Sequence, residues 1–191
     1  MPTPLTHALV GASMAQAAPN GIARWRYALL CSVLAILPDI DLLAFSFGIP
    51  YSAPLGHRGL AHSLPFAAVV AGVATFLAAR LAPRLRASAG QLYALTFAAT
   101  ASHGLLDATT NGGRGVALLA PFSDGRFFFP LRPIVVSPIH PERFLSLWVE
   151  VLTTEAVWVW LPLALLSMAF HIARLTTRAV ARISREANDP R

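Results

Sequence analysis

Long apolar runs, separated by short polar or proline- and glycine-rich segments, dominate the pattern of the chain. The strongest runs cover residues 27–47, 64–81, 92–106 and 145–171. The first is interrupted at Pro38-Asp39-Ile40-Asp41, where the proline removes a helical hydrogen bond and predicts a kink. Runs of this length predict helices that cross a membrane. The pattern therefore predicts an all-α, polytopic membrane helix bundle with about four spanning helices.

A shorter apolar stretch, residues 6–18, precedes these runs and predicts a short N-terminal helix. Pro4 is well placed to open it, and Pro19-Asn20-Gly21 is a turn cluster that ends it. It would extend about 21 Å, less than the roughly 30 Å of a hydrocarbon core, so it is either re-entrant or shielded by the other helices. Ala15-Gln16-Ala17 resembles a signal-peptidase site. No Lys or Arg precedes the apolar stretch, however, so we expect the segment to be retained.

Composition supports the membrane assignment and adds a tail. Of the 191 residues, 55% are hydrophobic and only 13% are charged, against roughly 25% charged in soluble domains. The pattern predicts a single membrane-embedded helical domain over residues 1–171 and an Arg-rich cytoplasmic tail over residues 172–191. The one cysteine, Cys31, lies in an apolar run and has no partner for an intramolecular disulfide.

The basic residues define a topology. All of them are arginines, and they cluster where apolar runs end, at Arg24 and Arg26, around Pro83, and from Arg174 onward. Arg-rich ends face the cytoplasm, and these three clusters agree with a chain that crosses the membrane alternately. The arginines therefore indicate membrane topology, and we expect no nucleic-acid partner despite the net charge of +6.

This topology brings most of the histidines and three aspartates to the outer face of the membrane. His103 and Asp107 are four residues apart and share one face of a helix. His171 lies on the Arg-rich side, and His140 lies in a loop between prolines. We expect neither of these two in the site. The residues that converge are His7, Asp39, Asp41, His57, His62, His103 and Asp107.

Ionisable residues at membrane depth are costly and usually functional. Zinc takes histidine nitrogen and aspartate oxygen, and seven ligands are too many for one tetrahedral ion. The sequence therefore predicts a divalent-metal site, with zinc as the expected metal and two ions, or three. Two neighbouring ions can hold a phosphate ester and activate water. Arg58 suits a phosphate oxygen or a carboxylate that orients the ligands, and Asp41 or Asp107 is the expected proton acceptor.

Other functions remain open at this stage. A metal-ion or proton transporter would use the same ligands, although transport needs a path from both sides. A structural or regulatory membrane protein would use the motif as a polar packing cluster, a role usually filled by Ser, Thr, Asn or Gln. A serine hydrolase through Ser63 or Ser102 lacks the expected sequence context for its nucleophile.

Four motifs occur in a fixed order and carry a family resemblance. They are Thr6-His7-x-x-x-Gly11, Pro38-Asp39-x-Asp41, His57-Arg58-Gly59-x-x-His62-Ser63 and Ser102-His103-x-x-x-Asp107, followed by Pro121-Phe122-Ser123. In this order they resemble the YdjM-type (LexA-regulated) family of bacterial inner-membrane metal-dependent hydrolases, over roughly residues 4–133. A more distant similarity connects the His-x-x-x-Asp pattern to zinc-dependent phospholipase C and related nucleases, which we treat as an analogy.

The resemblance implies a metal-dependent hydrolase in the bacterial inner membrane. The two-ion site and the phospholipase C analogy favour phosphate esters as the expected substrate class. The depth of the site favours membrane lipids or lipid-linked molecules as partners. From the topology we expect the site to face the periplasm or exterior. The oligomeric state is left open.

Overall fold

The computed structural model describes residues 1–19, 22–138 and 141–187, and most of these residues are helical. Only two isolated β-bridges, Thr110 with Ile134 and Val116 with Phe127, occur in the described residues. The all-α prediction is confirmed. The helices are α1 (Pro4–Ser13), α2 (Arg24–Ile36), α3 (Leu64–Leu81), α4 (Ala89–Asp107), α5 (Pro141–Glu155) and α6 (Leu161–Ala187). The 3₁₀ segments are η1 (Met14–Ala17), η2 (Leu37–Phe47), η3 (Leu60–His62) and η4 (Pro83–Ser88), and η5 (Ala156–Trp160) is a π-helix.

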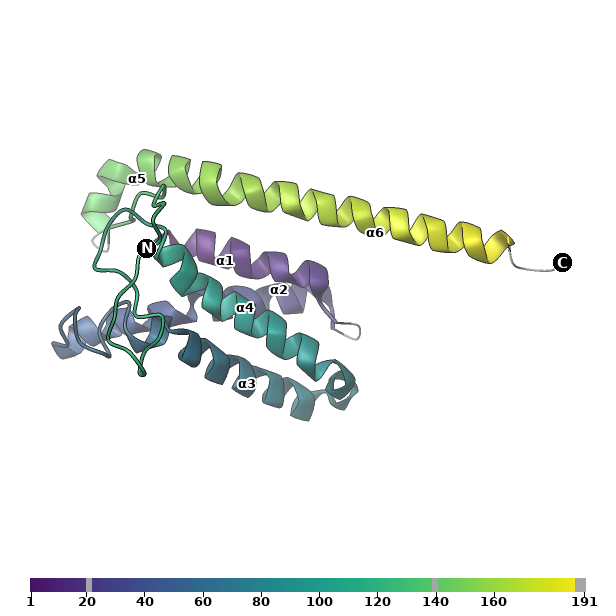
Figure 1. Cartoon of the computed structure of the whole chain (residues 1–191), viewed down its shortest axis with the longest axis horizontal. Coiled ribbons are helices and arrows are strands. Elements are labelled where there is room, and N and C mark those ends of the chain that lie inside the picture. Colours follow the sequence, from purple (N-terminus) through teal and green to yellow (C-terminus); the bar gives the residue numbers. More distant parts are fainter. Residues whose placement is uncertain (20–21, 139–140, 188–191) are drawn as a thin grey trace.

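Helices α1 to α4 form an antiparallel bundle. The chain runs back and forth along it, and α6 lies along one side and extends past the bundle, with α5 at its left-hand end (Figure 1). Helix α1 packs on α2, α3 packs on α4, and α4 also contacts α1 and α2. The loops that follow α2 and α4 gather at one end, while the Arg-bearing start of α2 and end of α3 lie at the other. This arrangement matches the alternating topology that the arginines predict.

Three segments are long and apolar enough to cross a membrane: Arg24–Phe47, Leu64–Leu81 and Leu145–Ala181. They correspond to three of the four predicted spans. The fourth prediction corresponds to α4, which has 19 residues but is not among these three. Several of its polar side chains, including Thr96 and Thr100, are buried in the bundle. Because protein rather than lipid surrounds much of α4, it needs less apolar character than its neighbours.

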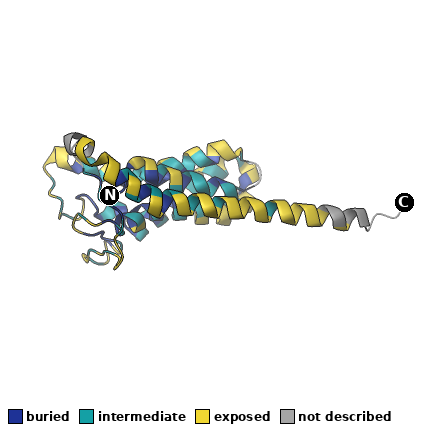
Figure 2. Cartoon of the chain, turned by 90° about the horizontal axis from the view of Figure 1, so that it is seen from above, coloured by how far each residue is buried: buried dark blue, intermediate teal, exposed yellow. Residues whose placement is uncertain are grey.

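The outer surfaces of the spanning helices are apolar and exposed. Trp25, Leu29 and Val33 on α2 are more than half exposed, as are Val69 and Phe76 on α3. Figure 2 shows that the exposed residues also follow α6 along its length, whereas the buried ones face into the bundle. Apolar patches of this extent mark surfaces that contact other proteins or lipid. Here they fit a bilayer.

The interruption that Pro38 predicts is a change of helix type. At Leu37 the α-helical pattern of α2 gives way to the 3₁₀ segment η2, eleven residues long, which Gly48 ends in a left-handed conformation with φ of 70°. Runs of 3₁₀ helix longer than three or four residues are uncommon and often mark functional or strained segments. This segment carries Asp39 and Asp41.

The last helix continues past the predicted start of the tail. Helix α6 runs without a break from Leu161 to Ala187, so residue 171 does not mark a change of backbone structure. The π-helix η5 separates α5 from α6. A π-turn inside a long helix is frequent at functional sites, and this one directly follows the buried Glu155.

Candidate metal centre

Four segments bring the predicted ligands together at the loop end of the bundle. His7 comes from α1, Asp39 and Asp41 from η2, and His103 and Asp107 from the last turns of α4. The segment between η2 and α3 supplies His57 and His62. Within the described ranges all seven predicted ligands are adjacent. His171 is exposed on α6, and His140 lies outside the described residues.

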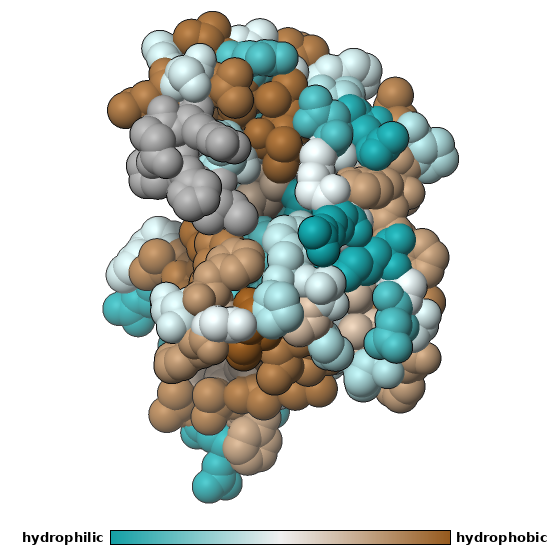
Figure 3. Space-filling view, turned by 90° about the vertical axis from the view of Figure 1, so that its left-hand side faces the viewer, coloured by the Kyte–Doolittle hydropathy of each residue, from teal (hydrophilic) through white to brown (hydrophobic). Residues whose placement is uncertain are grey.

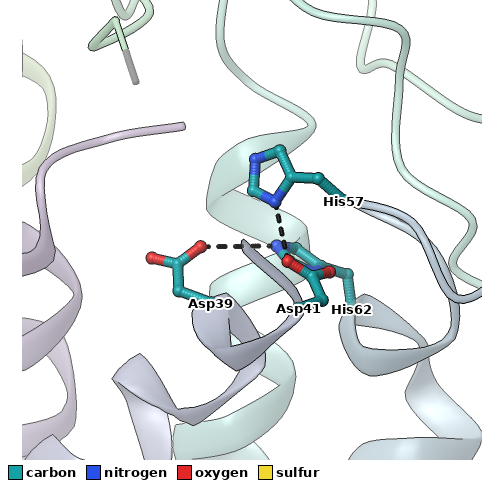
Figure 4. A group of neighbouring side chains, drawn as sticks. All are labelled: Asp39, Asp41, His57 and His62. Carbon is teal, nitrogen blue, oxygen red and sulfur yellow. Dashed lines mark hydrogen bonds and ion pairs between the residues drawn. The ribbon is translucent and has the colours of Figure 1, made fainter. Parts of the chain in front are cut away.

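The ligand atoms form two groups among the described residues. Asp39, Asp41, His57 and His62 form one, and His7, His103 and Asp107 form the other, with the atoms of each group within 4.8 Å of one another. Figure 4 shows the first group, with His57 and His62 directed toward the two aspartates. The groups meet where His62 Nε2 lies 3.1 Å from His103 Nε2. They therefore form one continuous cluster of donor atoms.

The tautomer of His103 follows from its contact with the backbone, and His62 has a close contact with Asp41. His103 Nδ1 lies 2.7 Å from the carbonyl oxygen of Ala35, so Nδ1 carries a proton and donates it. His62 Nδ1 lies 2.9 Å from Asp41 Oδ2, an ion-pair contact that does not meet hydrogen-bond geometry. With a proton on each Nδ1, the two neutral imidazoles have their lone pairs on the Nε2 atoms, which lie 3.1 Å apart. Facing lone pairs repel unless a cation lies between them.

Three donor atoms have the spacing of ligands to one ion. His103 Nε2 lies 3.1 Å from His62 Nε2 and 3.2 Å from Asp39 Oδ1, and the remaining side of the triangle is 3.7 Å. Atoms held 2.0–2.1 Å from a tetrahedral zinc are about 3.3–3.4 Å apart. Asp107 Oδ2 lies beside this triangle, 3.6 Å from His62 Nε2. The triangle therefore fits a zinc-sized cation.

Several of these atoms have no other hydrogen-bond partner. In the described part of the chain, both ring nitrogens of His7 and both oxygens of Asp39 and Asp107 are buried without a hydrogen bond. Leaving buried polar atoms unsatisfied is costly. Burial lowers the pKa of the His62 imidazole, although its contact with Asp41 opposes that shift. A neutral imidazole is the form that binds metal, so the residues present fit a divalent ion.

Asp41 organises the segment that carries the histidines. Its Oδ1 lies 2.8 Å from His57 Nδ1 and its Oδ2 lies 2.9 Å from His62 Nδ1. The backbone nitrogen of Arg58 also donates to Oδ2. Ligating histidines commonly donate their second ring nitrogen to a carboxylate that fixes the tautomer and ring orientation. The contacts of Asp41 match that role more closely than direct ligation.

Arg58 contacts Asp107 and is buried. Its Nε lies 2.9 Å from Asp107 Oδ2, and its Nη atoms donate to the oxygen of Gly112 and to Thr110 Oγ1. Its side chain is 1% exposed, and Asp107 is fully buried. Of the two roles that the sequence suggests for Arg58, orienting a carboxylate is the one these contacts support.

Arg126 braces the same segment, a role that the sequence did not reveal. Its guanidinium donates to the backbone oxygens of Tyr51, His57 and Arg58 and lies over the Tyr51 ring. Nothing local in the sequence reports a contact between residues this far apart.

The two serines considered as nucleophiles have other partners. Ser63 Oγ accepts a hydrogen bond from the backbone nitrogen of Phe66 and caps α3. Ser102 Oγ donates to the backbone oxygen of Ala99 within α4. These contacts give both hydroxyl groups ordinary helical roles and argue against a serine hydrolase.

Gly104 allows α4 to approach the histidine segment. A Cβ atom at this position would lie 2.3 Å from the backbone oxygen of His62. We expect Gly104→Ala to destabilise the protein by about 1–3 kcal/mol, as for overpacked cores, and to weaken zinc binding by moving His62 away from His103. Unfolding in detergent and zinc titration measure the two effects.

Gly72→Ala is the matched control, because a Cβ atom there meets nothing within 4 Å. Within a helix this change should be neutral or stabilising by up to about 1 kcal/mol. Wild-type stability and zinc affinity in the Gly104→Ala variant would contradict the close packing described here.

The comparisons with known proteins agree with this architecture. Residues 1–180 match the family described as YdjM inner membrane protein. The chain belongs to this family. It is also similar to the inner membrane protein YbcI of Escherichia coli strain K12, with 39% identity over 163 residues, which cover 85% of this chain and 92% of YbcI. No solved structure matches the chain.

Whereas the resemblance in the sequence ends near residue 133, the family match continues to residue 180. It therefore includes α5, η5 and most of α6. Both descriptions place their proteins in the inner membrane, in agreement with the helices that are able to span one. Neither description names a reaction.

Proposed function

We propose that this protein is a metal-dependent hydrolase of phosphate esters that uses the His/Asp cluster to hold two divalent ions, with zinc as the expected metal. The observation that carries the proposal is the triangle of His62 Nε2, His103 Nε2 and Asp39 Oδ1, whose spacing suits one ion. When bound, such ions supply an activated water and positive charge for the ester oxygens. The resemblance to metal-dependent hydrolases supports the same class.

The residues divide into ligands and groups that orient them. His7, Asp39, His62, His103 and Asp107 direct nitrogen or oxygen atoms toward the centre of the cluster. Asp41 orients His57 and His62, and Arg58 orients Asp107. His57 has Nε2 available as a ligand because its Nδ1 contacts Asp41.

Asp107 is the proton acceptor that we retain. The sequence offered Asp41 and Asp107 for this role. Asp41, however, already contacts the Nδ1 atoms of His57 and His62 and accepts a hydrogen bond from the backbone nitrogen of Arg58. Asp107 Oδ2 lies 2.9 Å from Arg58 Nε, whereas Oδ1 lies 3.5 Å from His7 Nε2 and makes no hydrogen bond within the described residues. Oδ1 can therefore accept a proton from a water molecule that reaches the cluster.

A membrane lipid or a lipid-linked molecule is the substrate class we propose. The cluster lies at the loop end of the bundle, where hydrophilic side chains gather on one side of a largely hydrophobic surface (Figure 3). A cleft of about 520 Å³ adjoins this end of α4 and is lined by apolar residues that include Leu106, Phe129 and Trp158. A cleft of this size and character fits an acyl chain.

We further propose that the chain crosses the membrane several times and that the cluster faces the periplasm. The arginines at the start of α2 and at the end of α3 lie at the opposite end of the bundle, and such ends remain in the cytoplasm. The substrate would then approach from the outer leaflet.

Transport of metal or protons is the alternative, and the packing weighs against it. A path through the bundle would have to pass a buried apolar cluster that includes Tyr27, Leu85 and Leu92. Transport sites usually lie near the middle of the bilayer, with access from both sides. Uptake of zinc into vesicles that contain the purified protein would favour the transporter.

Metal removal tests the proposed hydrolase. We expect protein purified in detergent to contain zinc by elemental analysis and to hydrolyse bis(p-nitrophenyl) phosphate and phospholipids in mixed micelles. Chelation should abolish both activities, and added Zn²⁺ should restore them. Hydrolysis that persists in metal-free protein, or a preparation that binds no divalent ion, would overturn the proposal.

A further inference from the structure

Glu155 is a buried carboxylate inside a predominantly apolar membrane helix. It is fully buried and lies within the segment Leu145–Ala181, which is apolar enough to cross a membrane. Ionisable side chains at such positions are costly and are usually retained for a function. Glu155 is not one of the ligands described above, and the sequence analysis did not single it out.

The carboxylate accepts three hydrogen bonds from the first turn of α1. Oε1 accepts from the backbone nitrogen of Thr3, and Oε2 accepts from the hydroxyl groups of Thr3 and Thr6, at distances of 2.5–2.6 Å. Thr3 is the N-cap of α1. A negative charge is stabilised at a helix N-terminus, where free N–H groups and the helix dipole are positive. These contacts attach α1 to α5.

A second donor from the same region completes the attachment. The indole nitrogen of Trp160 donates to Thr6 Oγ1 at 2.7 Å, so Thr6 is held by Glu155 and Trp160 together. Trp160 is the last residue of the π-helix η5. The π-turn changes the helical register between the two side chains, which lets both reach Thr6.

Thr6 directly precedes His7. The position of the His7 ring depends on the backbone, because its side-chain contacts within the described ranges include no hydrogen bond. In the described structure, neither ring nitrogen of His7 makes a hydrogen bond. The ring stacks on His103 with 3.7 Å between the centroids, and Nε2 lies 3.5 Å from Asp107 Oδ1. Because no hydrogen bond orients the ring, its position follows that of the first turn of α1.

We propose that Glu155 is a positioning residue for the metal centre: by holding Thr3 and Thr6, it keeps His7 against His103 and Asp107. The inference rests on the proposed function, since it assigns His7 as a ligand. In this role the π-helix brings Trp160 and Glu155 to the same threonine. The role also explains why an acidic side chain is buried in the membrane segment. It also makes α5 part of the centre, although α5 supplies no ligand.

Cobalt binding to the full-length protein in detergent tests this role. We expect Glu155→Gln, which keeps the side-chain volume but replaces one acceptor oxygen with an amide donor, to lower the affinity for Co²⁺ about tenfold. The visible Co²⁺ spectrum should change as it does in His7→Ala. Thr6→Val, which removes the hydroxyl and keeps the shape, should change affinity and spectrum in the same direction. Glu150→Gln is the matched control, because Glu150 is exposed on the same helix.

A double-mutant cycle separates positioning from general support of the fold. If Glu155 acts through His7, the variant that combines Glu155→Gln with His7→Ala binds Co²⁺ no more weakly than His7→Ala alone. Additive losses, or wild-type affinity and spectrum in both Glu155→Gln and Thr6→Val, would overturn the inference. Wild-type protein that binds no Co²⁺ would instead overturn the proposed function.

Discussion

Replacing His103 with alanine should remove the bound metal and reduce phosphodiester hydrolysis by more than about 100-fold, beyond the typical loss for a residue that only supports a ligand. The reason is its central position. His103 Nε2 lies within 3.2 Å of both His62 Nε2 and Asp39 Oδ1, and its ring stacks on His7. One substitution therefore removes a donor atom and the packing surface of a second one. Elemental analysis and initial rates on bis(p-nitrophenyl) phosphate measure the two losses.

His171→Ala is the matched control, since His171 is exposed on α6, away from the cluster. It should keep wild-type metal content and activity. Full zinc content in the His103→Ala variant would refute the assignment of His103 as a ligand, whatever its rate of hydrolysis.

Asp107→Asn should destabilise the metal-free protein by about 3–5 kcal/mol, the usual cost of removing one partner from a buried ion pair. Arg58 would keep its charge, 1% exposed, with only the oxygen of Gly112 and the hydroxyl of Thr110 as acceptors. Unfolding of metal-free protein in mixed micelles, followed by circular dichroism, measures the change. The variant should also lose zinc affinity, because Asp107 contacts His7 and His62.

Two further variants separate stability from metal binding. Asp124→Asn, at an exposed loop position, should leave both properties unchanged. Adding Arg58→Met to Asp107→Asn removes the unpaired charge and should recover much of the lost stability, but not the zinc affinity. Recovery of zinc binding in that double variant would indicate that Asp107 serves the fold and not the metal.

The sequence predicted the helical class and the set of converging residues because both follow from simple periodicities. Apolar runs define helices, and alternating membrane crossings with arginines at one end place the other ends together. The structure shows this convergence for all seven predicted residues. Three of the four predicted spans are long and apolar enough to cross a membrane, and the length of the fourth run does not reveal that protein surrounds much of α4.

Which residues of the cluster orient others, and which have atoms free to bind an ion, could not be predicted in the same way. That Asp41 orients two imidazoles while Asp39 keeps both oxygens free of hydrogen bonds depends on how η2 turns these neighbouring side chains in different directions. Glu155 escaped notice because its partners, Thr3 and Thr6, lie about 150 residues away in sequence. One sequence signal was available: an acidic residue in the middle of an apolar run.

The ligands come from α1, η2, the segment before α3, and α4, so no single segment holds a complete set. An ion that binds them will prefer the assembled bundle to any arrangement with separated helices, and the free energy of its binding adds to that of helix association. At an ion concentration one hundred times its dissociation constant, this contribution is about 2.7 kcal/mol. Metal supply during membrane insertion would then determine how much of the chain completes its tertiary structure, and metal-starved cells would contain more of the protein in a form open to proteolysis.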